Sequence, residues 1–92
     1  TASRILLEEV QYDQGRVTSL DWQSYPILRF ADCPAIKAIV VQRPQERPSG
    51  AGEETMAAAA AAIANAFFDA TGKRMDRFPF TPERVLATLR GA

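Results

Sequence analysis

The chain has 92 residues, 47% of them hydrophobic and 24% charged, and eleven basic side chains balance eleven acidic ones. This composition is typical of a folded domain, although a chain of this size buries only about two-thirds of the surface that its unfolded form exposes. The zero net charge leaves no field to attract nucleic acid, so we expect no nucleic-acid partner. One cysteine and no histidine exclude an internal disulfide and an ordinary His/Cys metal site, so any metal must take its ligands from elsewhere.

The N-terminal part of the chain favours a β-hairpin. Residues 4–12 and 16–20 are predicted strands, and Gly15 fits a left-handed position that closes a three-residue loop between them. Glu8 and Glu9 are adjacent in the first of these strands and would point to opposite faces. We therefore interpret them as solvated strand charges and not as a paired-carboxylate site.

A third strand is predicted at residues 36–42. This run follows Pro34 and is rich in β-branched residues, which indicates a strand buried on most of both faces. Cys33 has no histidine to activate it, so we expect a small buried apolar side chain and not a nucleophile. Prolines and glycines in residues 43–52 then predict a loop.

Two helices are predicted in the second half. The alanine-rich residues 54–71 have strong helix propensity, and Gly72 is suited to end the helix. One stripe of this helix carries residues 56, 60, 63, 67 and 70. Thr81 and Pro82 have the order of an N-cap and a first-turn proline, which predicts a short C-terminal helix of about nine residues. The expected fold is α+β, a hairpin plus one buried strand followed by two helices, in a single small domain over residues 1–92.

The candidate site is the turn Gly50-Ala51-Gly52-Glu53, directly before the long helix. Small residues let the backbone approach a ligand closely, and the start of a helix offers free amide donors, so a cofactor or a small anion could bind there. The pattern matches neither the dinucleotide fingerprint nor the nucleotide-triphosphate loop. The structural alternative for Glu53 is stabilisation of the helix N-terminus, worth about 0.3–1 kcal/mol.

Several motifs follow one another along the chain in a recognisable order. They are Tyr12-Asp-Gln-Gly-Arg16, Tyr25-Pro-Ile27, Ala31-Asp-Cys-Pro34, Gly50-Ala-Gly-Glu53, Ile63-Ala-Asn-Ala66, Asp69-Ala-Thr-Gly-Lys-Arg74, Phe78-Pro79 and Thr81-Pro-Glu-Arg-Val85. This order resembles the end of the molybdenum-binding large subunit in hydroxylases of the xanthine dehydrogenase/aldehyde oxidase family. It is most similar to the branch of isoquinoline oxidoreductase β-subunits and bacterial membrane-associated aldehyde dehydrogenases. The resemblance implies that the chain is the C-terminal fragment of a much larger subunit.

The resemblance also implies a reaction and its cofactors. The family oxidises aldehydes or hydroxylates N-heterocycles with water as the oxygen source, and it assigns Glu53 to remove a proton from the attacking hydroxyl. Gly50, Ala51 and Gly52 would then lie against a molybdopterin, in its cytosine dinucleotide form, held by the complete subunit. Two [2Fe-2S] clusters in a small iron–sulfur subunit would accept the electrons, with a cytochrome c as a further acceptor, in the bacterial periplasm or at a membrane, or alternatively in the cytoplasm. The fragment alone is expected to hold no cofactor and to be inactive; the alternative is a non-catalytic folding or docking domain with the same sequence pattern.

Overall fold

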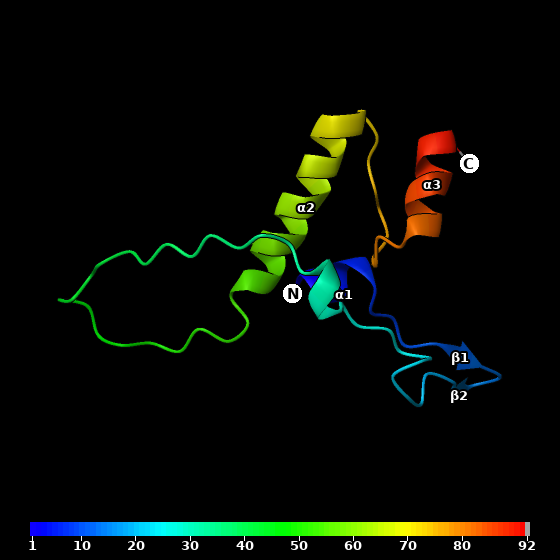
Figure 1. The fold of residues 1–92 in the computed structure, drawn as a ribbon, viewed down its shortest axis with the longest axis horizontal. Helices are drawn as coiled ribbons and strands as arrows, with labels where there is room; N and C mark the ends of the chain where they lie inside the picture. The colour runs from blue at the N-terminus through cyan, green and yellow to red at the C-terminus, as the bar shows by residue number, and fades with distance from the viewer. Residues whose placement is uncertain (92) are drawn as a thin grey trace.

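The computed structural model describes residues 1–91 as an α+β arrangement, which confirms the predicted fold class (Figure 1). Its elements are α1 (Ala2–Leu6), the hairpin strands β1 (Tyr12–Asp13) and β2 (Arg16–Val17), a 3-10 turn at Phe30–Asp32, α2 (Thr55–Thr71) and α3 (Pro82–Arg90). The radius of gyration is 16.7 Å, whereas a compact chain of this length would have about 12 Å. Much of the chain therefore extends away from its packed part. Within residues 1–91, no helix has the length and apolar character needed to cross a membrane.

The long helix α2 forms and ends as its sequence predicts. Alanine has the highest helix propensity of all residue types, so the alanine run favours a helix with few tertiary contacts. Gly72 follows it with φ of 68°, and the Gly72 amide donates to the Phe68 carbonyl oxygen at 2.7 Å. The half-buried positions of the helix are Ala59, Ala60, Ile63, Ala64 and Phe67. The predicted stripe is thus confirmed in its middle, while its two ends at residues 56 and 70 are exposed.

The C-terminal helix α3 also confirms its prediction. Thr81 is the N-cap, and its hydroxyl oxygen accepts a hydrogen bond from the Arg84 amide at 3.4 Å. Pro82 occupies the first turn, where its missing N–H costs nothing. Gly91 ends the helix with φ of 77°.

The packed centre of the chain lies around α1, where the sequence predicts a strand. That prediction for residues 4–12 is wrong, because residues 2–6 form a helical turn held by distant partners. Ile5 and Phe80 are each only 5% exposed, and the Phe80 amide donates to the Ile5 carbonyl oxygen at 2.7 Å. The Ser3 hydroxyl accepts from the Leu28 amide at 2.8 Å. Tertiary contacts therefore decide the local structure here, over a weak β pattern. We call Ile5, Glu9, Pro79, Phe80 and Arg84 the Phe80 junction.

The hairpin is shorter than predicted. It pairs Tyr12 with Val17 and Asp13 with Arg16, and a two-residue loop joins the strands. Gln14 has φ of 45° and Gly15 has φ of 79°, so both central positions of the turn are left-handed, as a type I′ turn requires. The prediction for Gly15 is confirmed, whereas the three-residue loop and the long strands are wrong.

Residues 29–53, which we call the open arm, leave the helices as a long excursion that returns to the start of α2 (Figure 1). Every residue of the open arm is exposed. The predicted buried strand at residues 36–42 is absent, and Val40 is 76% exposed. A strand needs a partner for its backbone groups, and residues 1–91 provide none for this run. The prediction that Cys33 is buried is wrong for the same reason.

Candidate functional site

The glycine turn lies where the sequence places it, at the end of the open arm and immediately before α2. Glu54 is the N-cap of α2, and the Glu53 carbonyl oxygen accepts a hydrogen bond from the Met56 amide at 3.1 Å. Gly50, Ala51, Gly52 and Glu53 are all exposed. The local sequence explains this position, because glycines and prolines prevent regular structure up to residue 52 and alanines favour a helix from residue 55 onward.

The backbone of the glycine turn is open to close approach. A Cβ atom added at Gly50 or at Gly52 would meet no heavy atom within 4 Å. The backbone at Gly50 and Gly52 is not left-handed, so it does not require glycine at either position. Among the described glycines, only Gly15, Gly72 and Gly91 have φ above +20°. The two glycines therefore have no conformational role that these 91 residues reveal, and their small size leaves room for a group that is not part of the segment.

The Glu53 carboxylate has no structural partner within residues 1–91. No side-chain hydrogen bond caps the start of α2, although Glu53 and Glu54 both stand there. The alternative role of Glu53 as a hydrogen-bonded helix cap is therefore not what the structure shows. A carboxylate at this position can still interact with the helix dipole, but that effect needs no particular one of the two glutamates.

Across residues 1–91, no three His, Cys, Asp or Glu side chains gather to bind a metal ion, and Cys33 lies exposed on the open arm. The glycine turn could contact a cofactor whose ligands come from other parts of a protein. It offers backbone that can be approached closely at Gly50 and Gly52, and one carboxylate, at Glu53, that can accept a proton.

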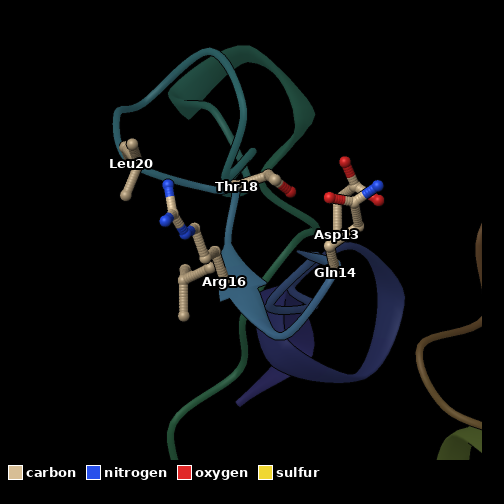
Figure 2. Close-up of a pocket in the computed structure, with 6 residues that line it drawn as sticks. Asp13, Gln14, Arg16, Thr18 and Leu20 are labelled. Atoms are coloured by element: carbon tan, nitrogen blue, oxygen red, sulfur yellow. The ribbon is translucent and has the colours of Figure 1, made fainter.

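A surface hollow of about 570 Å³ lies beside the hairpin, away from the glycine turn in sequence. Its lining residues are Asp13, Gln14, Arg16, Val17, Thr18 and Leu20. Figure 2 shows Asp13 and Gln14 on one side of the ribbon and Arg16 and Leu20 on the other, with Thr18 between them. All of these residues are exposed, and Asp13 and Arg16 are simply neighbours in the hairpin ladder. The hollow lacks the enclosed apolar lining of a typical ligand site.

The interpretation of Glu9 as a solvated charge is wrong. Arg84 Nη2 donates to both carboxylate oxygens of Glu9 at 2.8 Å, and Arg77 Nη2 lies 3.6 Å from Glu9 Oε1. Arg84 Nη1 also donates to the Pro79 carbonyl oxygen at 3.1 Å. The hydrogen bond from Arg84 lowers the pKa of Glu9, with help from a hydrogen bond from Gln11. This cluster joins the chain after α1 to the start of α3.

Glu8 is likewise engaged in the fold. Tyr25 Oη donates to Glu8 Oε2 at 3.0 Å, between residues 17 positions apart. Hydrogen bonds from Ser3 and Tyr25 lower the pKa of Glu8. The hydrogen bond with Glu8 in turn raises the pKa of the Tyr25 hydroxyl. The local sequence could not indicate these two pairings, because Tyr25 lies 17 positions from Glu8 and Arg84 lies 75 positions from Glu9.

Among the known proteins that match this chain, two align with almost all of it. A nicotinate dehydrogenase subunit of Pseudomonas putida is 47% identical over 91 residues, which cover 99% of this chain and 8% of that protein. A membrane-bound aldehyde dehydrogenase (pyrroloquinoline-quinone) of Gluconacetobacter polyoxogenes is 33% identical over 88 residues, which cover 96% of this chain and 11% of that protein. The chain thus spans about a tenth of the length of either relative. No family model and no solved structure matches it. These two alignments agree with the resemblance that the motif order around Glu53 indicates, and the chain is similar to one segment of each of these two dehydrogenases.

Proposed function

We propose that this chain is the C-terminal segment of the molybdenum-binding subunit of a dehydrogenase, and that Glu53 is the general base of the reaction. The observation that carries the proposal is the 47% identity over 99% of the chain to a dehydrogenase subunit. The segment contributes one small domain, residues 1–92, to a subunit that supplies the remainder of the cofactor pocket. By itself it is expected to be inactive, since it brings no cluster of metal ligands of its own among the residues described.

In this proposal the residues of the glycine turn have separate roles. Gly50, Ala51 and Gly52 bring backbone against the cofactor, which the open space around both glycines permits. Glu53 accepts, at a carboxylate oxygen, the proton of the water-derived hydroxyl that attacks an electron-poor carbon of the substrate. When bound, the molybdopterin supplies the two-electron oxidation. A base positioned within hydrogen-bond reach of its proton contributes roughly 10²- to 10⁴-fold to the rate.

The proposed substrate class rests on the two relatives. One relative is named for nicotinate and shares 47% identity, whereas the other is named for aldehydes and shares 33%. Both kinds of substrate present an electron-poor carbon bonded to nitrogen or oxygen, so the same base can serve either. The higher identity favours an N-heterocycle, and nicotinate is the first substrate to test, with an aldehyde as the second.

The electron path and the location of the whole enzyme are also part of the proposal. The word "subunit" in one relative's name supports a multi-subunit enzyme, and we propose a small iron–sulfur subunit with two [2Fe-2S] clusters as the partner. A cytochrome c is the proposed further acceptor. The name of the membrane-bound relative supports a location of the whole enzyme at a membrane or in the bacterial periplasm.

The test uses the complete subunit co-expressed with its iron–sulfur partner. Wild type is compared with Glu53→Gln and with the matched control Glu54→Gln, whose side chain is exposed and neighbours Glu53. Dye-linked oxidation of nicotinate and of an aldehyde gives turnover, and elemental analysis gives molybdenum content. Glu53→Gln should lower turnover by about 10²- to 10⁴-fold with molybdenum unchanged, whereas Glu54→Gln should stay close to wild type.

Two results would contradict the proposal. Wild-type turnover in Glu53→Gln would favour the alternative function, a non-catalytic folding or docking domain. Pyrroloquinoline quinone in place of molybdenum in the purified wild type would favour the cofactor named for the aldehyde dehydrogenase relative. Extracting the cofactor and recording its absorbance spectrum separates these two groups.

A further inference from the structure

Residues 36–41 form an exposed and mostly apolar run in the open arm. Ile36 is 79% exposed and Val41 is 77% exposed. Exposed apolar patches of this kind mark interaction surfaces in soluble proteins. The run lies between Pro34 and Pro44, and it is rich in β-branched residues, which favour a strand over a helix.

In an extended conformation the run would be apolar on one side and apolar except for Lys37 on the other. One face would carry Ile36, Ala38 and Val40, and the other would carry Lys37, Ile39 and Val41. A strand with one face in water alternates apolar and polar residues, whereas a near-continuous apolar run is typical of a strand covered on both faces. The partner must therefore provide backbone pairing and packing layers on either side.

The backbone of this run is unpaired within the segment. No hydrogen bond joins a backbone N–H of residues 35–42 to any other group of residues 1–91. The hairpin strands β1 and β2 are two residues long and already pair with each other. They cannot extend into a sheet that covers a run so much longer than themselves.

We propose that residues 36–42 become a β-strand by pairing with a sheet in the remainder of the subunit, and that this strand docks the segment onto it. The inference rests on the proposed function, because it takes the chain to be one part of a longer subunit. The aligned region covers only 8% of the nicotinate dehydrogenase subunit, so a protein of that length has ample chain for a covered sheet. A second copy of this chain fits less well, because two isolated copies of the run would pair into a ribbon with both apolar faces still in water.

The docked strand has a consequence for the glycine turn. Residues 43–53 would then be fixed at both ends, by the strand on one side and by α2 on the other. A loop closed at both ends samples far fewer conformations than one attached at a single end. Docking would thus hold Glu53 at a defined position, although the turn is open in the segment alone.

Amide hydrogen exchange tests this proposal in the complete subunit and in the 92-residue chain. Amides of residues 36–42 should exchange at least about 100-fold more slowly in the complete subunit than in the chain alone. Equal exchange in the two samples would overturn the proposal. Protection in the chain alone that rises with its concentration would also overturn it, in favour of self-association.

A pair of proline variants in the complete subunit sharpens the test. Val40→Pro removes a backbone donor from the proposed strand and should abolish the protection of residues 36–42. Arg47→Pro is the matched control on the same arm, since Pro48 already restricts residue 47 to extended backbone, and it should keep the protection. Protection that survives Val40→Pro would overturn the proposal. If Val40→Pro does not fold, the wild-type exchange comparison decides alone. Amide exchange measures backbone pairing and does not depend on turnover. Failure of the proposed role of Glu53 would appear in the turnover of Glu53→Gln, whereas failure of this inference would appear in the exchange of residues 36–42.

Discussion

The Phe80 junction and the open arm both carry apolar residues, but they place them in opposite surroundings. In the Phe80 junction, Ile5 and Phe80 are buried and joined by a backbone hydrogen bond, and Arg84 binds Glu9. In the open arm, Phe30 is 98% exposed and the β-branched run has no backbone partner among the described residues. The junction has its partners within the chain, and the arm does not.

This difference separates the part of the chain that stabilises its fold from the part that we propose to dock onto the rest of a subunit. Regions with buried apolar contacts and protected hydrogen bonds open last, and regions without them open first. The junction should therefore set the stability of the isolated chain. The arm, which carries both the unpaired run and the glycine turn, should contribute little to that stability.

The largest expected effect is on the Phe80 side of this comparison. Phe80→Ala removes a buried ring that stacks on Phe78 with centroids 4.7 Å apart, and it should lower the free energy of unfolding by about 3–5 kcal/mol. The matched control is Phe30→Ala in the open arm, which should change it by no more than about 0.5 kcal/mol. Urea unfolding of the 92-residue chain, followed by far-ultraviolet circular dichroism, measures both.

Similar losses in the two phenylalanine variants would break the comparison. That result would mean that the arm packs onto the helices in solution, where the structure shows its side chains exposed. A wild-type-like Phe80→Ala variant would likewise show that the junction is not the centre of the fold.

A pair of glycines gives a smaller effect. Gly72 ends α2 in the left-handed region, so Gly72→Ala should lower the free energy of unfolding by about 1–2 kcal/mol. Gly50→Ala should leave the stability of the segment unchanged, because the added Cβ atom meets open space. Thermal unfolding of both variants checks the contrast. A Gly50→Ala variant as unstable as Gly72→Ala would show that the turn is packed within the segment.

Sequence predicts those parts of the fold whose causes are local. The alanine run, the Thr81 cap and the left-handed glycines act within a few residues, and α2, α3 and the left-handed Gly15 follow from them, whereas the two-residue length of the hairpin loop does not. The α1 turn could not be predicted, because it depends on Phe80 and on other distant partners. The predicted strand at residues 36–42 is wrong for this segment because a strand depends on a neighbour that no local pattern can supply.

The candidate site shows the same division. The position of Glu53 between a glycine turn and α2 follows from local composition, and the structure places it there. Its proposed role depends on groups outside residues 1–91, and these groups belong neither to the local pattern nor to the packing of the described residues. The pairing of Glu9 with Arg84 was missed for a related reason, since the two residues lie 75 positions apart.

The smallest expected effect concerns that pairing and its dependence on pH. Arg84 lowers the pKa of Glu9 below its ordinary value of 4.5, so the folded chain binds the Glu9 proton less tightly than the unfolded chain does. The stabilisation is therefore fully present above pH 4.5 and is lost as pH falls through the lowered folded pKa. The difference in unfolding free energy between wild type and Glu9→Gln should be constant at neutral pH and shrink in acid, and 1 M salt should reduce it.

In an Arg84→Met background the Glu9→Gln substitution should lose most of this pH dependence. A difference that stays constant into strong acid would show that Arg84 does not hold Glu9 in solution, and the ionic part of the Phe80 junction would then contribute no more than the open arm.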